Sequence, residues 1–304
     1  MTNCKIAPNY NPWLRCGKLA RMGILSIQSN VASGHVGNAA AVYPLQCLGH
    51  DVWPVHTVML SQHPGHSDWR GHRVPASDLA AVLKGLDDHG VFKDCSAVLT
   101  GYLGAADVGD VVVEAWANVR HANPGALICC DPVMGDSGEG LYVPDDLVAF
   151  YRHALVPAAD VIMPNVFELE TLHGGPMETI EAVIAAAQYL ISKGPKTVIV
   201  TSVPDGGDAL GNILVTPTES WIISTPRLAL RAKGSGDVLS ALWLGHYLRG
   251  GQAVAALEIA VATVFAIVEM AVKDQLLELP IVAAGSAGPA GFNAPRRFKA
   301  WRVD

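Results

Sequence analysis

Residues 234–237 are Gly234, Ser235, Gly236 and Asp237, and an apolar run of helical length follows them to Leu248. Glycine adopts left-handed backbone conformations and lets a ligand approach the main chain closely. Amides at the start of a helix, together with the helix dipole, favour a bound anion. A carboxylate in that first turn can accept a proton from a hydroxyl held over it. The four residues therefore predict a phosphoryl-transfer site, with a glycine-rich turn and a helix-start aspartate as the alternative.

Oxygen-bearing side chains follow several predicted strands at the point where each strand ends. They are Ser29, Asp131, Asp136, Asn165, Glu168, Thr201 and Ser202. In a mostly parallel sheet, ligands bind at the carboxyl ends of the strands. Mg²⁺ on a nucleotide takes oxygen ligands and keeps several waters. These residues therefore predict a magnesium–nucleotide site beside residues 234–237, with a strand-ending turn as the alternative for Asp131.

Short apolar runs alternate with segments of helical length along the chain. Predicted strands cover residues 23–28, 52–59, 97–100, 126–130, 160–163 and 197–201, with a hairpin at 213–215 and 221–224. Predicted helices cover residues 38–48, 77–86, 108–120, 145–153, 166–173, 180–192, 238–248 and 254–272. We expect a loop at residues 29–37 and a serine cap at the start of the helix at 77–86. The alternation predicts an α/β fold of three layers, α/β/α, with a mostly parallel central sheet and helices on both faces.

Composition bounds the organisation of the chain and its partners. The 304 residues carry a net charge of −7, which argues against a nucleic-acid partner. Six cysteines without CxxC spacing favour a reducing compartment, and we predict a cytoplasmic protein. The apolar stretch at 254–272 contains Glu258 and Glu269, so we expect a buried helix and no membrane partner. We predict an extension at residues 1–22, with organelle targeting as its alternative, and one domain at residues 23–304.

Several short segments occur in a fixed order between residue 23 and about residue 275. They are residues 25–29 (LSIQS), 34–38 (GHVGN), 61 with 63, 100–104 (TGYLG), 131–135 (DPVMG), 164–168 (PNVFE) and 234–237 (GSGD). Each alone is a weak signal, but the ordered set resembles the pyridoxal kinase family of the ribokinase-like superfamily. The resemblance implies that fold, a homodimer, and ATP-dependent phosphorylation of the 5′-hydroxymethyl group of pyridoxal, and usually of pyridoxine and pyridoxamine.

The resemblance also implies a role for each matched position. Asp237 would be the general base, and the amides of residues 234–236 would stabilise the transferring phosphoryl group. The pyridoxal site would comprise Ser29, Val36, Val58, His63, Pro64, Tyr102 and Asp237. The ATP site would comprise Asp131, Tyr142, Asn165, Glu168, Thr201, Ser202, Leu230, Ala232 and Ser235. Asp131, Asp136 and Glu168 would lie near Mg²⁺ or a monovalent cation such as K⁺, residues 135–142 would form a mobile lid, and the product would pass to enzymes that depend on pyridoxal phosphate.

Three residues depart from the family pattern. Pro64 follows His63 where the family often has threonine, and proline has no N–H with which to hold a substrate. Met163 stands where some relatives have threonine, which removes a hydroxyl from a monovalent-cation site. Lys233 precedes the glycine-rich loop where relatives often carry an apolar residue. We expect its charge to be solvated, with nucleotide phosphates as the alternative partner.

Other functions stay open on the sequence alone. A hydroxymethylpyrimidine kinase of the same superfamily usually has a Gly/Ser-rich segment after the first strand and often cysteine in place of Asp237. A sugar kinase usually has a double-glycine loop, which is not apparent in residues 23–60. A vitamin B6 carrier would need no general base. The aspartate at position 237 therefore favours a pyridoxal kinase over the carrier and over the pyrimidine kinase.

Overall fold

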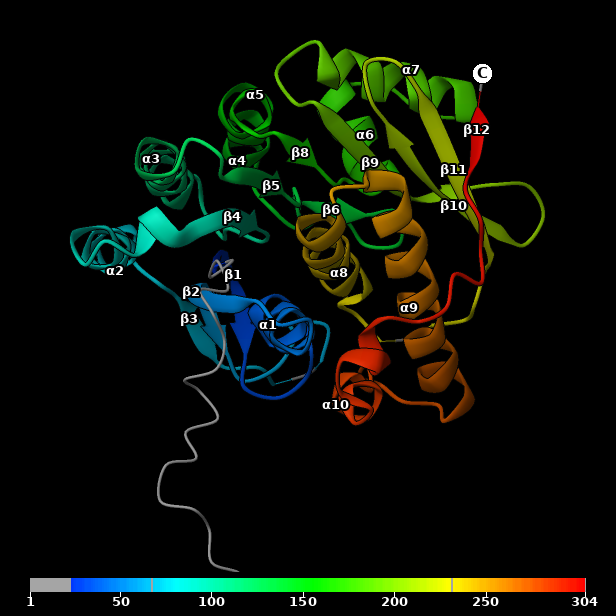
Figure 1. Ribbon diagram of the computed structural model, residues 1–304, viewed down its shortest axis with the longest axis horizontal. Coiled ribbons are helices and arrows are strands. Elements are labelled where there is room, and N and C mark those ends of the chain that lie inside the picture. The colour runs from blue at the N-terminus through cyan, green and yellow to red at the C-terminus, as the bar shows by residue number, and fades with distance from the viewer. Residues whose placement is uncertain (1–22, 67, 231, 304) are drawn as a thin grey trace, which may run out of the picture.

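Alternating apolar residues build the centre of the sheet. In strand β4 (Cys95–Thr100), Ala97 and Leu99 belong to the core on one face and Val98 belongs to the core on the other. All three are fully buried, which is typical of a strand in a parallel sheet covered on both sides. The computed structural model describes residues 23–66, 68–230 and 232–303. It confirms the predicted three-layer α/β/α fold with a mostly parallel central sheet (Figure 1).

Within the described residues, the central sheet has ten strands in the order β12-β11-β10-β9-β8-β5-β4-β1-β2-β3, and β6 and β7 form a separate two-stranded hairpin. Neighbouring strands are parallel along the series β2, β1, β4, β5, β8 and β9. Strand β3 runs antiparallel to β2, and each of β10, β11 and β12 runs antiparallel to the strand before it. The remaining bounds are β1 (Gly23–Val31), β2 (Asp51–Leu60), β3 (Gly71–Arg73), β5 (Leu127–Cys130), β6 (Gly135–Asp136), β7 (Gly140–Leu141), β8 (Val161–Ile162), β9 (Thr197–Pro204), β10 (Ala209–Val215), β11 (Ser220–Pro226) and β12 (Trp301–Val303).

Helices cover both faces of the sheet. Helices α2 to α7 pack on one face, and α1, α8, α9 and α10 pack on the other (Figure 1). Their bounds are α1 (Asn38–Cys47), α2 (Ala76–Asp88), α3 (Ala106–Ala122), α4 (Asp145–Phe150), α5 (Val156–Ala158), α6 (Val166–His173), α7 (Ile180–Ile191), α8 (Ser235–Gly250), α9 (Ala253–Lys273) and α10 (Ile281–Gly285). Short 3₁₀ helices lie at Val91–Asp94 and Gly288–Phe292, and a π-helical turn at Tyr151–Leu155 joins α4 to α5.

Helix α9 confirms the buried helix predicted at residues 254–272. By length and composition alone it is apolar enough to cross a membrane. Half of its most apolar 18-residue window is buried, however, and the helix packs against α8 and the β10–β11 hairpin. This pattern is typical of a helix that belongs to the core of a folded domain.

Two irregular strand pairings lie at the carboxyl ends of the strands. The β1–β2 register shifts between Gln28 and Asn30, so Ser29 lies within strand β1 rather than in the predicted loop. The β9–β10 register shifts opposite Thr201 and Ser202, and Ser202 has a φ of 59°. Bulges re-aim side chains, and non-glycine residues with positive φ gather at functional sites. The sheet is therefore irregular where the sequence predicts ligand residues.

Several local predictions need correction. Helix α2 begins at Ala76 with Pro75 at the N-cap and no side-chain cap, so the predicted serine cap is wrong. Ser77 lies in the first turn and instead contacts Asp78. Strands β3 and β12 and helix α10 were not predicted, because each has only three to five residues. Strand β12 and helix α10 also depend on contacts with distant elements, β11 and α1. The predicted extension, residues 1–22, lies outside the described residues.

Candidate active site

The glycine-rich loop, residues 234–237, lies at the start of helix α8. Gly234 occupies the N-cap with a φ of 95°, and a Cβ there would stand 2.0 Å from the carbonyl oxygen of His35. Both the conformation and this close approach require glycine. The first intrahelical hydrogen bond runs from the Val238 amide to the Gly234 carbonyl. The amides of the residues between them have no acceptor within the helix, so they can bind an anion. We call residues 234–237 the anion loop.

Asp237 lies partly buried in the first turn of α8. The amide of Gly37, at the start of α1, donates a hydrogen bond to its carboxylate. Desolvation raises the pKa of Asp237 to about 6, and the Gly37 hydrogen bond limits that increase. A carboxylate with this pKa is mostly ionised at neutral pH and still holds a transferred proton well. Its chemistry therefore fits a general base.

Asp131 follows strand β5 and is a buried candidate for a cation ligand. It is buried, and burial raises its pKa well above the ordinary value. The negative charges of Glu168 and Asp237 raise that pKa further, while a hydrogen bond with Ser240 opposes the shift. A cation beside these carboxylates would relieve their mutual repulsion, so the donor chemistry fits Mg²⁺ that arrives with a nucleotide.

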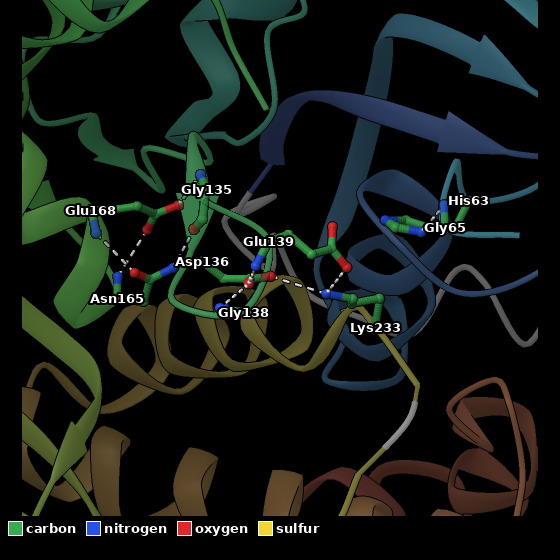
Figure 2. Close-up of polar contacts among 9 residues, drawn as sticks. All are labelled: His63, Gly65, Gly135, Asp136, Gly138, Glu139, Asn165, Glu168 and Lys233. Atoms are coloured by element: carbon green, nitrogen blue, oxygen red, sulfur yellow. Dashed lines mark hydrogen bonds and ion pairs between the residues drawn. The ribbon is translucent and has the colours of Figure 1, made fainter. Parts of the chain in front are cut away.

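Glu168 has a different task from the one predicted. Its Oε2 accepts a hydrogen bond from the Asn165 amide at 2.8 Å, and the Asn165 side chain caps α6 by accepting from the Glu168 amide at 2.9 Å. Its Oε1 accepts from the amides of Met134 at 2.9 Å and Gly135 at 3.4 Å. Both carboxylate oxygens of Glu168 therefore accept hydrogen bonds from backbone amides (Figure 2). Glu168 fixes the base of the predicted lid, and Asp131 stays the candidate metal ligand.

Both carboxylate oxygens of Asp136 have protein partners in this arrangement. Its Oδ1 accepts from the amides of Gly138 and Glu139, each at 2.8 Å, which closes the β6–β7 turn. Its Oδ2 lies 3.0 Å from the ammonium of Lys233. Within the described residues, no three His, Cys, Asp or Glu side chains are grouped to hold a metal ion. The structure therefore does not bring Asp131, Asp136 and Glu168 together as one ligand set.

The prediction that the Lys233 charge is solvated is wrong. Its ammonium lies 3.0 Å from Asp136 and 2.7 Å from Glu139 Oε1, and its side chain is 40% exposed. Desolvation lowers the pKa of Lys233, but the bonds to Glu139 and Asp136 outweigh it and the net shift is upward. Lys233 therefore stays charged and joins the anion loop to the lid (Figure 2).

Two predicted substrate residues lie against the anion loop and its neighbour, Gly37. A Cβ on Gly37 would stand 2.3 Å from the Oγ of Ser29, so this serine packs directly on the residue whose amide holds Asp237. A Cβ on Gly234 would stand 3.4 Å from Val36. Ser29 and Val36 are therefore brought next to the candidate base, as the resemblance implied.

The other substrate residues lie on neighbouring loops. Val58 and Tyr102 meet around Gly104, where a Cβ would stand 3.1 Å from Val58 and 3.7 Å from Tyr102. Burial lowers the pKa of His63, and the positive charge of Lys233 lowers it further. His63 therefore lies near the lysine that contacts the predicted lid. Pro64 is exposed in the turn after His63. The structure therefore places four of the predicted substrate residues in two pairs, one beside Asp237 and one around Gly104, and leaves Pro64 exposed.

A cavity of about 170 Å³ opens beside the anion loop and matches the predicted nucleotide side. Of the predicted ATP residues, those that line it are Thr201, Ser202, Leu230 and Ser235. Tyr142 lies on the lid and is 43% exposed, and Ala232 is buried just before the anion loop. Asn165 caps α6 and donates to the carbonyl of Gly135, so it holds the lid base instead.

Most residues of the cavity wall were not predicted from the sequence. Polar Asn212 and Thr225 from the β10–β11 hairpin line it, as do residues from one side of α9. The α9 residues are Val261, Val264, Phe265 and Val268. Their spacing of three and four residues places them on one helical face. The sequence signal that could have revealed this wall is that residues 254–272 are apolar on more than one helical face. A second hollow, at residues 46 and 49–53, lies at the amino-terminal end of β2, away from Asp237.

Comparisons with known proteins show the family to which the chain belongs. A family model described as phosphomethylpyrimidine kinase matches residues 72–278, more than half of the chain. The pyridoxal kinase PdxY of Rubrobacter xylanophilus is 44% identical over 286 residues, which are 93% of this chain and 98% of the relative. The pyridoxal kinase PdxY of Corynebacterium diphtheriae is 45% identical over 273 residues, which are 88% and 95% of the two chains. This chain belongs to the pyridoxal kinase family.

A solved structure of the pyridoxal kinase family gives the same fold. The Leishmania donovani pyridoxal kinase in complex with ADP and pyridoxamine has a TM-score of 0.87 and 29% identity. The alignment covers 93% of this chain and 100% of that chain. The family model carries the name of the rival kinase class, but the curated relatives that match nearly the whole chain are pyridoxal kinases. This outcome agrees with Asp237 in place of the rival's cysteine.

Proposed function

We propose that this chain transfers the γ-phosphoryl group of ATP to the 5′-hydroxymethyl group of pyridoxal and makes pyridoxal 5′-phosphate. Pyridoxine and pyridoxamine are alternative acceptors. The observation that carries the proposal is the position of Asp237. This carboxylate, with a pKa of about 6, is the last residue of the anion loop and lies in the first turn of α8. The family membership supports the choice of acceptor and donor.

The proposed mechanism uses the anion loop and its aspartate together. Asp237 takes the proton of the acceptor hydroxyl as that oxygen attacks the γ-phosphorus. The bond between this phosphorus and the β,γ-bridging oxygen breaks, and ADP leaves. We assign the negative charge of the transferring group to the free amides of residues 235–237, which shifts the set implied by the resemblance, residues 234–236, by one residue along the helix. Mg²⁺, when bound with ATP, would be held by Asp131 and would neutralise phosphate charge. The cavity beside the loop accommodates the rest of the nucleotide, with Asn212 and Thr225 as polar contacts for it.

Ser29→Ala is expected to raise the Kd for pyridoxal about tenfold, because one hydrogen bond to a bound ligand is worth about 1–1.5 kcal/mol. The serine Oγ packs on Gly37 beside the base, which supports a contact with the pyridine ring. Titration of pyridoxal without ATP measures the effect. Ser33→Ala, an exposed serine in the loop that follows β1, is the control. An unchanged affinity in Ser29→Ala would place the ring elsewhere.

The rate is expected to fall at acid pH. Because the pKa of Asp237 is about 6, protonation removes the base progressively below that pH. We expect kcat/KM to decline about tenfold per pH unit there, with an apparent pKa near 6 that belongs to the coupled carboxylates. If the decline has the same apparent pKa with pyridoxal and with pyridoxamine as the substrate, the titrating group belongs to the enzyme and not to the substrate. A flat profile down to pH 5 would be incompatible with this base.

The acceptor is tested by competition. Purified protein is given Mg·ATP with equal concentrations of pyridoxal and hydroxymethylpyrimidine, and both phosphorylated products are measured by mass spectrometry. We expect pyridoxal phosphate as the main product. Phosphorylation of the pyrimidine alone would assign the same machinery to the rival substrate.

The remaining expectations are proposals that follow from the family. We propose that residues 23–304 act as one domain, that the protein is a cytoplasmic homodimer, and that its product passes to enzymes that need pyridoxal phosphate. We propose Mg²⁺ as the divalent ion. A K⁺ site at Asp136 is less well supported, because the Lys233 ammonium and two amides use the oxygens of that carboxylate.

A further inference from the structure

Lys233 connects two segments that are 97 residues apart in the sequence. It stands directly before Gly234, and its ammonium bridges Asp136 and Glu139, at 3.0 and 2.7 Å. Both carboxylates belong to the tip of the β6–β7 hairpin. The bridge therefore ties the tip of this hairpin to the anion loop (Figure 2).

The base and the tip of the hairpin are held in different ways. At the base, Glu168 accepts from the amides of Met134 and Gly135, and Asn165 donates to the Gly135 carbonyl at 2.8 Å. These contacts are buried or partly buried, so the base is fixed. At the tip, the Lys233 bridge has side chains that are 33–50% exposed. Exposed ion pairs are weak one at a time, so a bridge of this kind can open and close.

The bridge also lies beside the loop that carries His63. The charges of Lys233 and Glu139 both act on His63, in opposite directions. The hairpin tip and the anion loop therefore meet at the bridge, and His63 lies near enough for both charges of the bridge to act on it. A closed hairpin here would cover the point at which phosphoryl group and acceptor come together, and exclusion of water there favours transfer to the acceptor over hydrolysis.

We propose that Lys233 is a positioning residue that latches the lid tip onto the anion loop and so directs the phosphoryl group to the alcohol rather than to water. The inference rests on the proposed kinase activity. Asp136 shapes the lid turn through the amides of Gly138 and Glu139 and presents its second oxygen to the latch. Glu139 supplies the second half of the latch from the exposed face of the turn.

The test compares coupling of ATP use to product formation. Lys233→Met and Glu139→Gln each remove one side of the latch, and the double variant completes a cycle. Lys84→Met is the matched control, because it removes an exposed ion pair with Asp88 on α2, remote from the anion loop. The readouts are ADP released per pyridoxal phosphate formed, and kcat for pyridoxal phosphate.

Wild type and Lys84→Met are expected to release one ADP per pyridoxal phosphate. Lys233→Met is expected to lower kcat for the product about three- to tenfold and to raise the ADP-to-product ratio at least twofold. Glu139→Gln should act in the same direction, and the double variant should be no worse than Lys233→Met, because contacting residues are not additive.

Two outcomes would overturn the latch. One is tight coupling with an unchanged kcat in both single variants. The other is a loss in Lys233→Met alone with no effect of Glu139→Gln, which would make Lys233 a direct phosphate ligand. If Lys233→Met does not fold, Glu139→Gln decides alone. A wild-type protein that forms no pyridoxal phosphate would refute the proposed function instead, so the two failures are distinguishable.

Discussion

Asp237→Asn is expected to lower kcat for phosphorylation of pyridoxal by about 10²–10⁴-fold, the usual contribution of a positioned general base. Asparagine keeps the size of the side chain and cannot accept the proton. ATP and pyridoxal should still bind, because the anion loop and the cavity are unchanged. Initial rates of pyridoxal phosphate formation, with both ligands titrated separately, measure the effect. A variant that turns over at the wild-type rate would remove Asp237 from the mechanism.

The same substitution is expected to stabilise the ligand-free protein. Desolvation raises the pKa of Asp237 to about 6 in the folded state, so its ionised form destabilises the fold above that pH. The penalty is absent below the ordinary pKa of aspartate and is complete above pH 6. We expect Asp237→Asn to gain about 1–2 kcal/mol at pH 8, a few degrees in Tm, and nothing at pH 4. Equal Tm gains at both pH values would contradict this origin.

Gly236→Ala is expected to separate folding from function. A Cβ at this position would meet no atom within 4 Å, so the protein can accept alanine. In a helical turn alanine should even add about 0.5–1 kcal/mol of stability. The methyl group would project from the anion loop, where the phosphoryl group binds, and we expect kcat/KM for ATP to fall on the order of 10²-fold. Thermal unfolding and ATP-dependent initial rates measure the two effects.

Two other glycines, at the N-cap and at the end of α8, serve as controls for Gly236→Ala. Gly250, the last residue of α8, also has open space around it, so Gly250→Ala should change stability in the same way and leave kcat/KM unchanged. Gly234→Ala should lose stability, because its Cβ would collide with the His35 carbonyl and its φ is 95°. Wild-type kcat/KM in Gly236→Ala would show that the phosphoryl group binds away from this loop.

The sequence was sufficient for features that local pattern determines. The apolar run that ends at Cys130 predicted a strand buried on both faces, and β5 is that strand. Two glycines and Asp237 before an apolar helical segment predicted the start of α8. Because parallel strands end at one edge of the sheet, Ser29, Asp131 and Thr201 could be expected at that edge before any coordinates were known.

What the sequence could not supply depends on contacts between distant residues. Nothing local to Lys233 indicates Asp136 as its partner, and a lone lysine is most often solvated. Phe265 and Asn212 line one cavity although they belong to different elements. Strand β12 has three residues and exists because it pairs with β11. Helix α2 begins at Ala76, so Ser77 lies inside its first turn and Pro75 occupies the N-cap position that the sequence assigned to a serine.

The proposed enzyme transfers a phosphoryl group to pyridoxal repeatedly. This activity is tested most directly by following the absorbance of pyridoxal phosphate when a small amount of purified protein meets excess Mg·ATP and pyridoxal. We expect many equivalents of pyridoxal phosphate per protein chain, and their loss in Asp237→Asn. At most one equivalent of bound pyridoxal, with no ATP consumed, would rule out this activity and make the protein a carrier of the vitamin.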